Sequence, residues 1–289
     1  MGNNSHPLAV VVALGGSLKV VKAMVDACPE ALDERLGGGR GRTLLHYAIS
    51  EGAHVEIIQY LTSRCSPSLV SQTDSFGGIP LHLATSYPSS SICVLLHLLE
   101  IHPDGAHALD KKSQTALHRA CKSRATLTKI QALIEANPMA LFWKDFEKNT
   151  PLGWAERMDH SLSDVSVETI DLMSMMEDVL TLGCSERVII DALHDDGTNK
   201  QKKQRAIYIL YRFSAMSWYE GIRIAFACNR NLTSLIDIPF ELYPELLSLL
   251  GKKSDDDGDD GCRYQANHFR LESLYAVLLR YAPGCIFES

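Results

Sequence analysis

The sequence predicts an all-α fold: a solenoid of repeated helix pairs followed by a small C-terminal helical domain. Three observations predict it. A six-residue motif recurs at nearly constant spacing, apolar residues after each copy follow helical spacing, and a proline follows each apolar stretch. The 289 residues are enough for about two domains. We expect the repeats to occupy residues 1–184 and a second domain to occupy residues 185–289.

The motif occurs at residues 43–48, 79–84, 115–120 and 150–155, and its aligned leucines lie 36, 36 and 35 residues apart. A fainter copy begins at His6. Such regular spacing is typical of repeat proteins, in which each unit has an apolar face that only a neighbouring unit can bury. The positions that define the motif are Thr43, Leu45, His46, Ala48, Pro80, Leu81, His82, Ala84, Thr115, Leu117, His118, Ala120, Thr150, Pro151, Leu152 and Ala155.

These residues resemble the T-P-L-H-x-A signature of the ankyrin-repeat family, which opens the first of two antiparallel helices. The resemblance covers about residues 5–182 and implies five units, of which the first and last are degenerate. Their approximate bounds are 5–40, 41–76, 77–112, 113–147 and 148–184. The fold that the resemblance implies is therefore an ankyrin-repeat solenoid.

Each copy of the motif suits the start of a helix. Thr43, Thr115 and Thr150 lie where an N-cap hydroxyl accepts a hydrogen bond from a free backbone N–H. Pro80 and Pro151 lie at the first helical position, where no N–H is needed. The Leu and Ala of each copy are three residues apart, so we expect them to share the buried face.

A second helix is predicted in each unit from apolar residues at helical spacing, and Pro67, Pro103 and Pro138 are expected to end these helices. The last unit departs from the pattern, because Gly153 replaces the histidine and the second helix is longer, about 165–182. We interpret it as a modified end cap.

The three motif histidines, His46, His82 and His118, occur once per unit. Packed helices are about 10 Å apart, too far for these side chains to share a metal ion with bonds of roughly 2 Å. The resemblance implies instead that each histidine forms structural hydrogen bonds between adjacent turns. We therefore expect no metal and no cofactor.

The resemblance also implies a binding surface, made by the turns before each motif and the first helix of each unit. Basic residues outnumber acidic ones at these positions, and Phe76 and Phe146 are the aromatic residues among them. This combination suits a protein partner, namely an acidic peptide or helix with apolar anchors; ordinary solvated loops are the alternative. The expected partner-binding residues are Arg40, Arg42, Glu51, Phe76, Tyr87, Lys111, Lys112, Gln114, Lys122, Phe146 and Arg157.

The second half lacks the period. We expect helices at 185–193, 239–250 and 267–281, a buried helical pair within 204–228, and a solvated acidic loop at 254–261, which lacks the final glutamate of an EF-hand calcium site. The basic stretch 200–205 could be a nuclear import signal or a solvated linker. Residues 238–250 loosely resemble an F-box helix or the end of a SOCS box.

Composition excludes several classes of protein. Hydrophobic residues make up 46% of the chain, too many for a disordered protein, and the net charge of −7 argues against a nucleic-acid binder. No apolar run approaches the roughly 20 residues of a membrane span, and no signal peptide is evident. The eight cysteines form no CxxC pair, which indicates a reducing, intracellular location, cytoplasmic or nuclear.

Function follows from these points. No Walker loop, nucleophile elbow, kinase motif or zinc-ligand spacing is present, so we expect no enzyme. The sequence predicts a monomeric scaffold or adaptor that binds a protein partner on the concave ankyrin face. The alternative is a ubiquitin-ligase substrate receptor that docks through residues 238–250.

Overall fold

The computed structural model describes residues 7–32, 34–35, 39–64, 67–87, 90–158 and 164–181, and further on residues 202, 205–206, 208–210, 212–213, 216, 218–229 and 232. The chain divides into two compact units, Met1–Asp171 and Leu172–Ser289. The expected helices at 185–193, 239–250 and 267–281, the acidic loop 254–261 and the resemblance at 238–250 lie outside the described residues.

The first unit is built from helix pairs, and the fold is all-α over the residues that the structure describes. Each of the first four pairs consists of a short first helix, a second helix of ten residues and a short 3₁₀ turn, whereas the second helix of the last pair has 18 residues. The elements are α1 (Pro7–Ala13), α2 (Leu18–Ala27), η1 (Pro29–Leu32), α3 (Leu44–Ser50), α4 (Val55–Arg64), η2 (Pro67–Val70), α5 (Pro80–Ser86), α6 (Ile92–Ile101), η3 (Pro103–His107), α7 (Ala116–Lys122), α8 (Leu127–Ala136), η4 (Pro138–Phe142), α9 (Pro151–Met158) and α10 (Asp164–Thr181).

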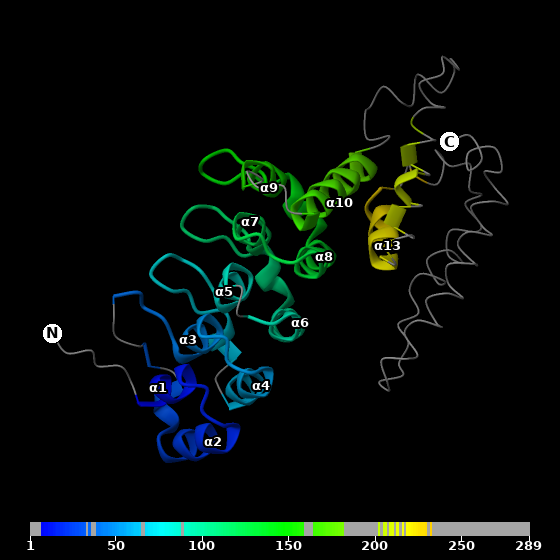
Figure 1. The fold of residues 1–289 in the computed structure, drawn as a ribbon. Coiled ribbons are helices and arrows are strands. Elements are labelled where there is room, and N and C mark those ends of the chain that lie inside the picture. Colours follow the sequence, from blue (N-terminus) through cyan, green and yellow to red (C-terminus); the bar gives the residue numbers. More distant parts are fainter. Residues whose placement is uncertain are drawn as a thin grey trace, which may run out of the picture. The chain divides into compact units, whose positions relative to one another are not determined.

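The helix pairs stack in sequence order. The first helices α1, α3, α5, α7 and α9 contact one another in succession, and the second helices α2, α4, α6 and α8 form a parallel row behind them (Figure 1). The loops between units extend to one side of the first-helix row (Figure 1). This is the solenoid that the repeat period predicts, because every unit buries its apolar faces against its neighbours.

The threonine caps form as expected. Thr43 Oγ1 accepts a hydrogen bond from His46 N, and Thr115 Oγ1 accepts one from His118 N. Thr150 Oγ1 accepts from Gly153 N at 3.1 Å. Ile79 has no hydroxyl to offer, but its backbone N–H still donates to His82 Nδ1 at 3.3 Å. One of the two capping interactions is therefore retained in the unit that lacks threonine.

The prolines between units begin 3₁₀ turns. Helices α4, α6 and α8 end at Arg64, Ile101 and Ala136, before Pro67, Pro103 and Pro138 respectively. Proline cannot donate the next helical hydrogen bond, so the chain leaves the α-helix before it and enters a tighter turn.

Burial follows the motif with one exception. Leu45 is fully buried, Leu81 and Leu117 are 3% and 2% exposed, and the motif alanines Ala48, Ala84 and Ala120 are fully buried. Leu152 in α9 is only half-buried. The last unit thus buries its motif leucine less completely than the three units before it.

The second unit is described in part. Helix α10 begins and ends within one residue of its expected bounds, and its residues Met173, Met176 and Val179 are fully buried. The described residues between 205 and 213 are helical, and α13 (Tyr219–Cys228) follows a turn at Met216, as a helical pair requires. Phe213 packs edge-on against Trp218 with ring centroids 5.1 Å apart. None of the described helices is both long and apolar enough to span a membrane.

Candidate partner-binding surface

Three turns project from the stack, and we call them finger turns: residues 74–78, 110–114 and 145–149. Each is organised by the aspartate at its start. Asp110 Oδ1 accepts hydrogen bonds from Lys112 N at 2.7 Å and Gln114 N at 2.9 Å, and Asp74 and Asp145 bind their own turns in the same way. A single carboxylate oxygen therefore fixes each turn.

Backbone hydrogen bonds join neighbouring finger turns. Ser75 N donates to Arg40 O at 2.8 Å, Lys111 N donates to Phe76 O at 3.0 Å, and Phe146 N donates to Lys112 O at 3.0 Å. These bonds hold the expected binding residues of successive units at fixed spacing.

The motif histidines connect each first helix to the backbone in or just before the next finger turn. The Nε2 atoms of His46, His82 and His118 lie 3.0, 3.0 and 3.1 Å from the carbonyl oxygens of Gly78, Gln114 and Trp143. Because a carbonyl can only accept, each Nε2 carries the proton, and Nδ1 accepts from the backbone N–H three residues earlier.

The fold keeps these histidines neutral. Burial lowers the pKa of His46 and of His82 to about 4, although the hydrogen bond to a carbonyl opposes the shift in both. Burial also lowers the pKa of His118. The neutral ring is the form that both hydrogen bonds require, so geometry and electrostatics agree.

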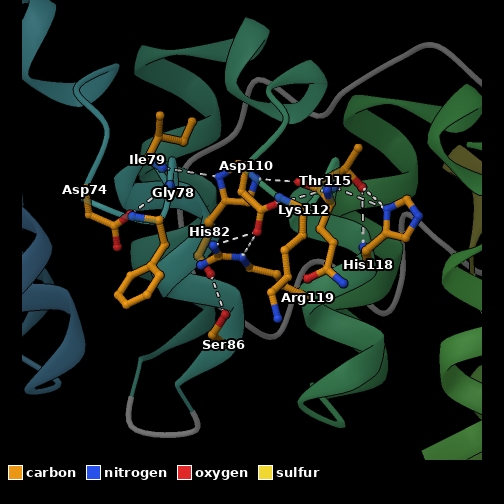
Figure 2. Close-up of polar contacts among 12 residues, drawn as sticks. Asp74, Gly78, Ile79, His82, Ser86, Asp110, Lys112, Thr115, His118 and Arg119 are labelled. Carbon is orange, nitrogen blue, oxygen red and sulfur yellow. Dashed lines mark hydrogen bonds and ion pairs between the residues drawn. The ribbon is translucent and has the colours of Figure 1, made fainter. Parts of the chain in front are cut away.

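Arg119 lies on α7, and its side chain binds the second carboxylate oxygen of Asp110, the aspartate of finger turn 110–114. Its Nε and Nη2 donate to Asp110 Oδ2 at 2.9 and 2.7 Å, and Figure 2 shows the side chain reaching from the helix to the turn. Burial on its own raises the pKa of Asp110, but the hydrogen bonds from Gln114 N and from Arg119 outweigh it and hold that pKa below its ordinary value. Asp110 therefore stays ionised.

Trp154, in the last unit, binds the second carboxylate oxygen of Asp145, the aspartate of finger turn 145–149. Its Nε1 donates to Asp145 Oδ2 at 2.7 Å, and Gln114 Nε2 donates to the same oxygen at 2.8 Å. Burial raises the pKa of Asp145, and these hydrogen bonds lower it by more, so the net shift is downward. Asp145 therefore joins α9 to finger turn 145–149 and, through Gln114, this turn to finger turn 110–114.

Beside these turns lies a cleft of about 390 Å³. We call it the basic cleft. Five of its lining residues belong to the expected binding set, and Asp110 and Arg119 were not expected. The residues that line it are Phe76, Ser86, Asp110, Lys111, Lys112, Gln114, Arg119, Lys122 and Ser123.

Gln114 differs from the other expected residues because it is only 3% exposed. Its amide is directed to Asp145, so it lies in the wall of the basic cleft and not on an open surface. Phe76 and Phe146, in contrast, are 56% and 73% exposed.

The remaining expected residues lie outside the basic cleft, and three of them, Arg42, Tyr87 and Arg157, form side-chain contacts of their own. Arg42 Nη2 donates to the Tyr87 hydroxyl at 3.0 Å. The Arg157 guanidinium lies 4.9 Å from the Trp154 ring centroid and donates to Asn149 Oδ1 at 3.2 Å, while the Lys122 ammonium lies 4.1 Å from the same ring. Arg40 and Glu51 are exposed.

Sequence reasoning missed Arg119 and Asp110 as a pair. Both Asp110–Arg119 and Asp145–Trp154 are nine residues apart, from the start of the finger turn to the variable position of the motif. Leu83 occupies the equivalent motif position, nine residues after Asp74, and its side chain has no hydrogen-bond donor. The nine-residue spacing of aspartate and side-chain donor was the available signal.

The fold and this surface define a helical-repeat protein with an ordered surface formed by its finger turns and first helices. A family model for ankyrin repeats in three copies matches residues 8–104, and the same unit continues beyond the match in α7 and α8. Residues 8–104 of the chain are therefore ankyrin repeats. None of the curated proteins compared with the chain matches it. Ankyrin repeats generally act as protein–protein interaction modules and are typically non-enzymatic.

Proposed function

We propose that this protein is a non-catalytic scaffold that binds an acidic segment of a protein partner in the basic cleft. The observation that carries the proposal is the position of Phe76, more than half exposed, beside a cleft that also contains Lys111, Lys112 and Lys122. An apolar anchor framed by cations suits an acidic peptide or helix that carries an apolar side chain.

The rigidity of the surface supports the same function. Finger turns that are fixed by aspartates and joined by backbone hydrogen bonds lose little conformational freedom when a partner binds. A preorganised surface of this kind binds more tightly than a flexible loop of equal composition, because less ordering is required on association.

The test is partner recovery with a triple variant, Phe76→Ala, Lys111→Ala and Lys112→Ala. Proximity labelling with the native chain identifies candidate partners, and purified candidates are then bound to both forms. The variant should retain its thermal unfolding midpoint and lose recovery of the partner. Undiminished recovery would place the binding surface elsewhere on the molecule.

A matched control uses three exposed residues away from the basic cleft: Lys19→Ala, Met139→Ala and Lys144→Ala. This triple variant removes the same number of positive charges and one large apolar side chain. It should recover the partner as well as the native chain does. Loss in both triple variants would indicate a general effect of charge.

A further inference from the structure

We propose that the basic cleft binds a phosphorylated side chain of the partner, with the phosphate among Lys111, Lys112 and Lys122. This inference rests on the proposed function and specifies the chemistry of its ligand. It comes from an excess of positive charge in the basic cleft that the lining residues themselves do not neutralise.

The carboxylate in the basic cleft is already fully occupied. Asp110 Oδ1 accepts two backbone N–H groups of its own turn, and Oδ2 accepts both hydrogen bonds from Arg119. The charge of Asp110 is therefore cancelled by Arg119 and not by a lysine. Among the described residues, no ion pair involves Lys111, Lys112 or Lys122.

The other polar groups of the cleft wall are committed to the fold. Ser86 Oγ donates to His82 O at 2.7 Å, and Ser123 Oγ donates to Thr85 O at 2.8 Å. The Gln114 amide donates to Asp145. The ammonium groups are thus the positive charges left for a ligand, and the Lys122 ammonium is held by its contact with the Trp154 ring.

Three uncompensated positive charges around one cleft favour a ligand that concentrates more than one negative charge. A phosphate monoester carries about −1.5 to −2 charges at pH 7 on three acceptor oxygens, whereas a carboxylate carries one charge. Lysine binds phosphate as a point charge, while a planar carboxylate gains most from the paired donors of arginine. The arginine of this cleft is already used by Asp110.

The volume and the apolar wall indicate a side chain of a protein and not a free ion. A cleft of about 390 Å³ accommodates a whole side chain, and the exposed Phe76 ring can contact its carbon atoms or an adjacent apolar residue. Although Lys111 and Lys112 are exposed, the three lysines surround one cleft of side-chain size, which a flat membrane surface would not fill. We therefore assign the phosphate to a peptide and not to a lipid headgroup.

The experiment uses the full chain and four fluorescent peptide libraries with degenerate flanks. The central residue is fixed as phosphoserine, phosphotyrosine, glutamate or serine, and a leucine is fixed two positions away. Fluorescence anisotropy should give at least tenfold tighter binding of one phosphorylated library than of the glutamate library, with affinity falling as salt is raised.

Variants localise the effect. Lys111→Gln with Lys112→Gln should reduce the phosphate preference to less than threefold, and Lys19→Gln with Lys144→Gln, which makes the same charge change at exposed sites elsewhere, should preserve it. Preservation in the first double variant would overturn the assignment to this cleft.

The remaining outcomes separate the two proposals. Equal binding of the glutamate and phosphorylated libraries overturns the phosphate assignment and leaves the acidic-partner function in place. Binding of vesicles that contain 5% phosphatidylinositol phosphate, lost in the same double variant, with no peptide binding, overturns both. No binding of any library, together with undiminished partner recovery in the Phe76 triple variant, also overturns both.

Discussion

Arg119 donates two hydrogen bonds, of 2.9 Å from Nε and 2.7 Å from Nη2, to a single carboxylate oxygen of Asp110. The side chains are 16% and 3% exposed, so this ion pair is largely removed from water. It fixes the finger turn 110–114 to helix α7, which follows that turn, and cancels the only acidic charge among the residues that line the basic cleft. The pair therefore contributes both to stability and to the charge of the cleft that we propose as the binding site.

Arg119→Met should lower the free energy of unfolding by about 1–3 kcal/mol, because Asp110 loses two charged donors but keeps its two backbone N–H partners. Binding of acidic peptides should weaken as well, since the released carboxylate would attract a cleft lysine. Urea denaturation and peptide titration measure the two effects. The exposed Arg40→Met is the control and should change stability by less than about 0.5 kcal/mol.

The pH dependence of stability should have a step between pH 6.5 and 4. In the unfolded chain a histidine has a pKa near 6.5, whereas burial lowers the pKa of His46 and His82 to about 4. Between these values the unfolded state binds protons that the folded state does not, so stability is complete above pH 6.5 and falls on acidification. The slope is up to about 1.4 kcal/mol per pH unit for each histidine.

Denaturation of His82→Gln across this range checks the assignment. The variant should have a shallower slope than the native chain, whatever its stability at pH 7. Met139→Gln, a change of an exposed residue that does not titrate, should keep the native slope. The depressed pKa values of Asp110 and Asp145 act at lower pH, below about 3.9, so they do not account for this step.

Leu117→Ala should destabilise the protein by about 2–5 kcal/mol, because Leu117 is 2% exposed and its removal leaves a cavity between stacked helices. Leu152→Ala, at the same motif position in the last unit, should cost less, about 1 kcal/mol, since Leu152 is half-buried. Equal losses in thermal denaturation would mean that the two leucines are buried alike.

The repeat period was enough to predict the helix pairs and the caps of Thr43 and Thr115, because these features recur at each copy, and the resemblance to ankyrin repeats implied the structural hydrogen bonds of the histidines. Features that occur once were not predictable in this way. Arg119 stands at a variable motif position, and only its distance from Asp110 reveals the pairing.

The candidate binding residues were predictable as positions but not in their contacts. The resemblance implied that Gln114 and Arg42 lie on the concave face; the Gln114 amide turns toward Asp145 of the next finger turn, and Arg42 donates to Tyr87. A period of about 36 residues specifies equivalent positions in each unit. It does not specify which of two neighbouring units a long side chain will contact.

The contact between finger turns can be tested at glycine. Gly77 and Gly39 both have φ of +77°, a region that disfavours residues with a Cβ, so alanine at either position costs about 1–2 kcal/mol of backbone strain. A Cβ on Gly77 would also lie 2.7 Å from Lys111 N, whereas a Cβ on Gly39 would meet no atom within 4 Å. Gly77→Ala should therefore destabilise the protein more than Gly39→Ala does.

Because Lys111 N donates to Phe76 O, Gly77→Ala should also weaken peptide binding in the basic cleft, and Gly39→Ala should not. Equal unfolding free energies for the two variants would indicate that the turns do not press on each other at Gly77.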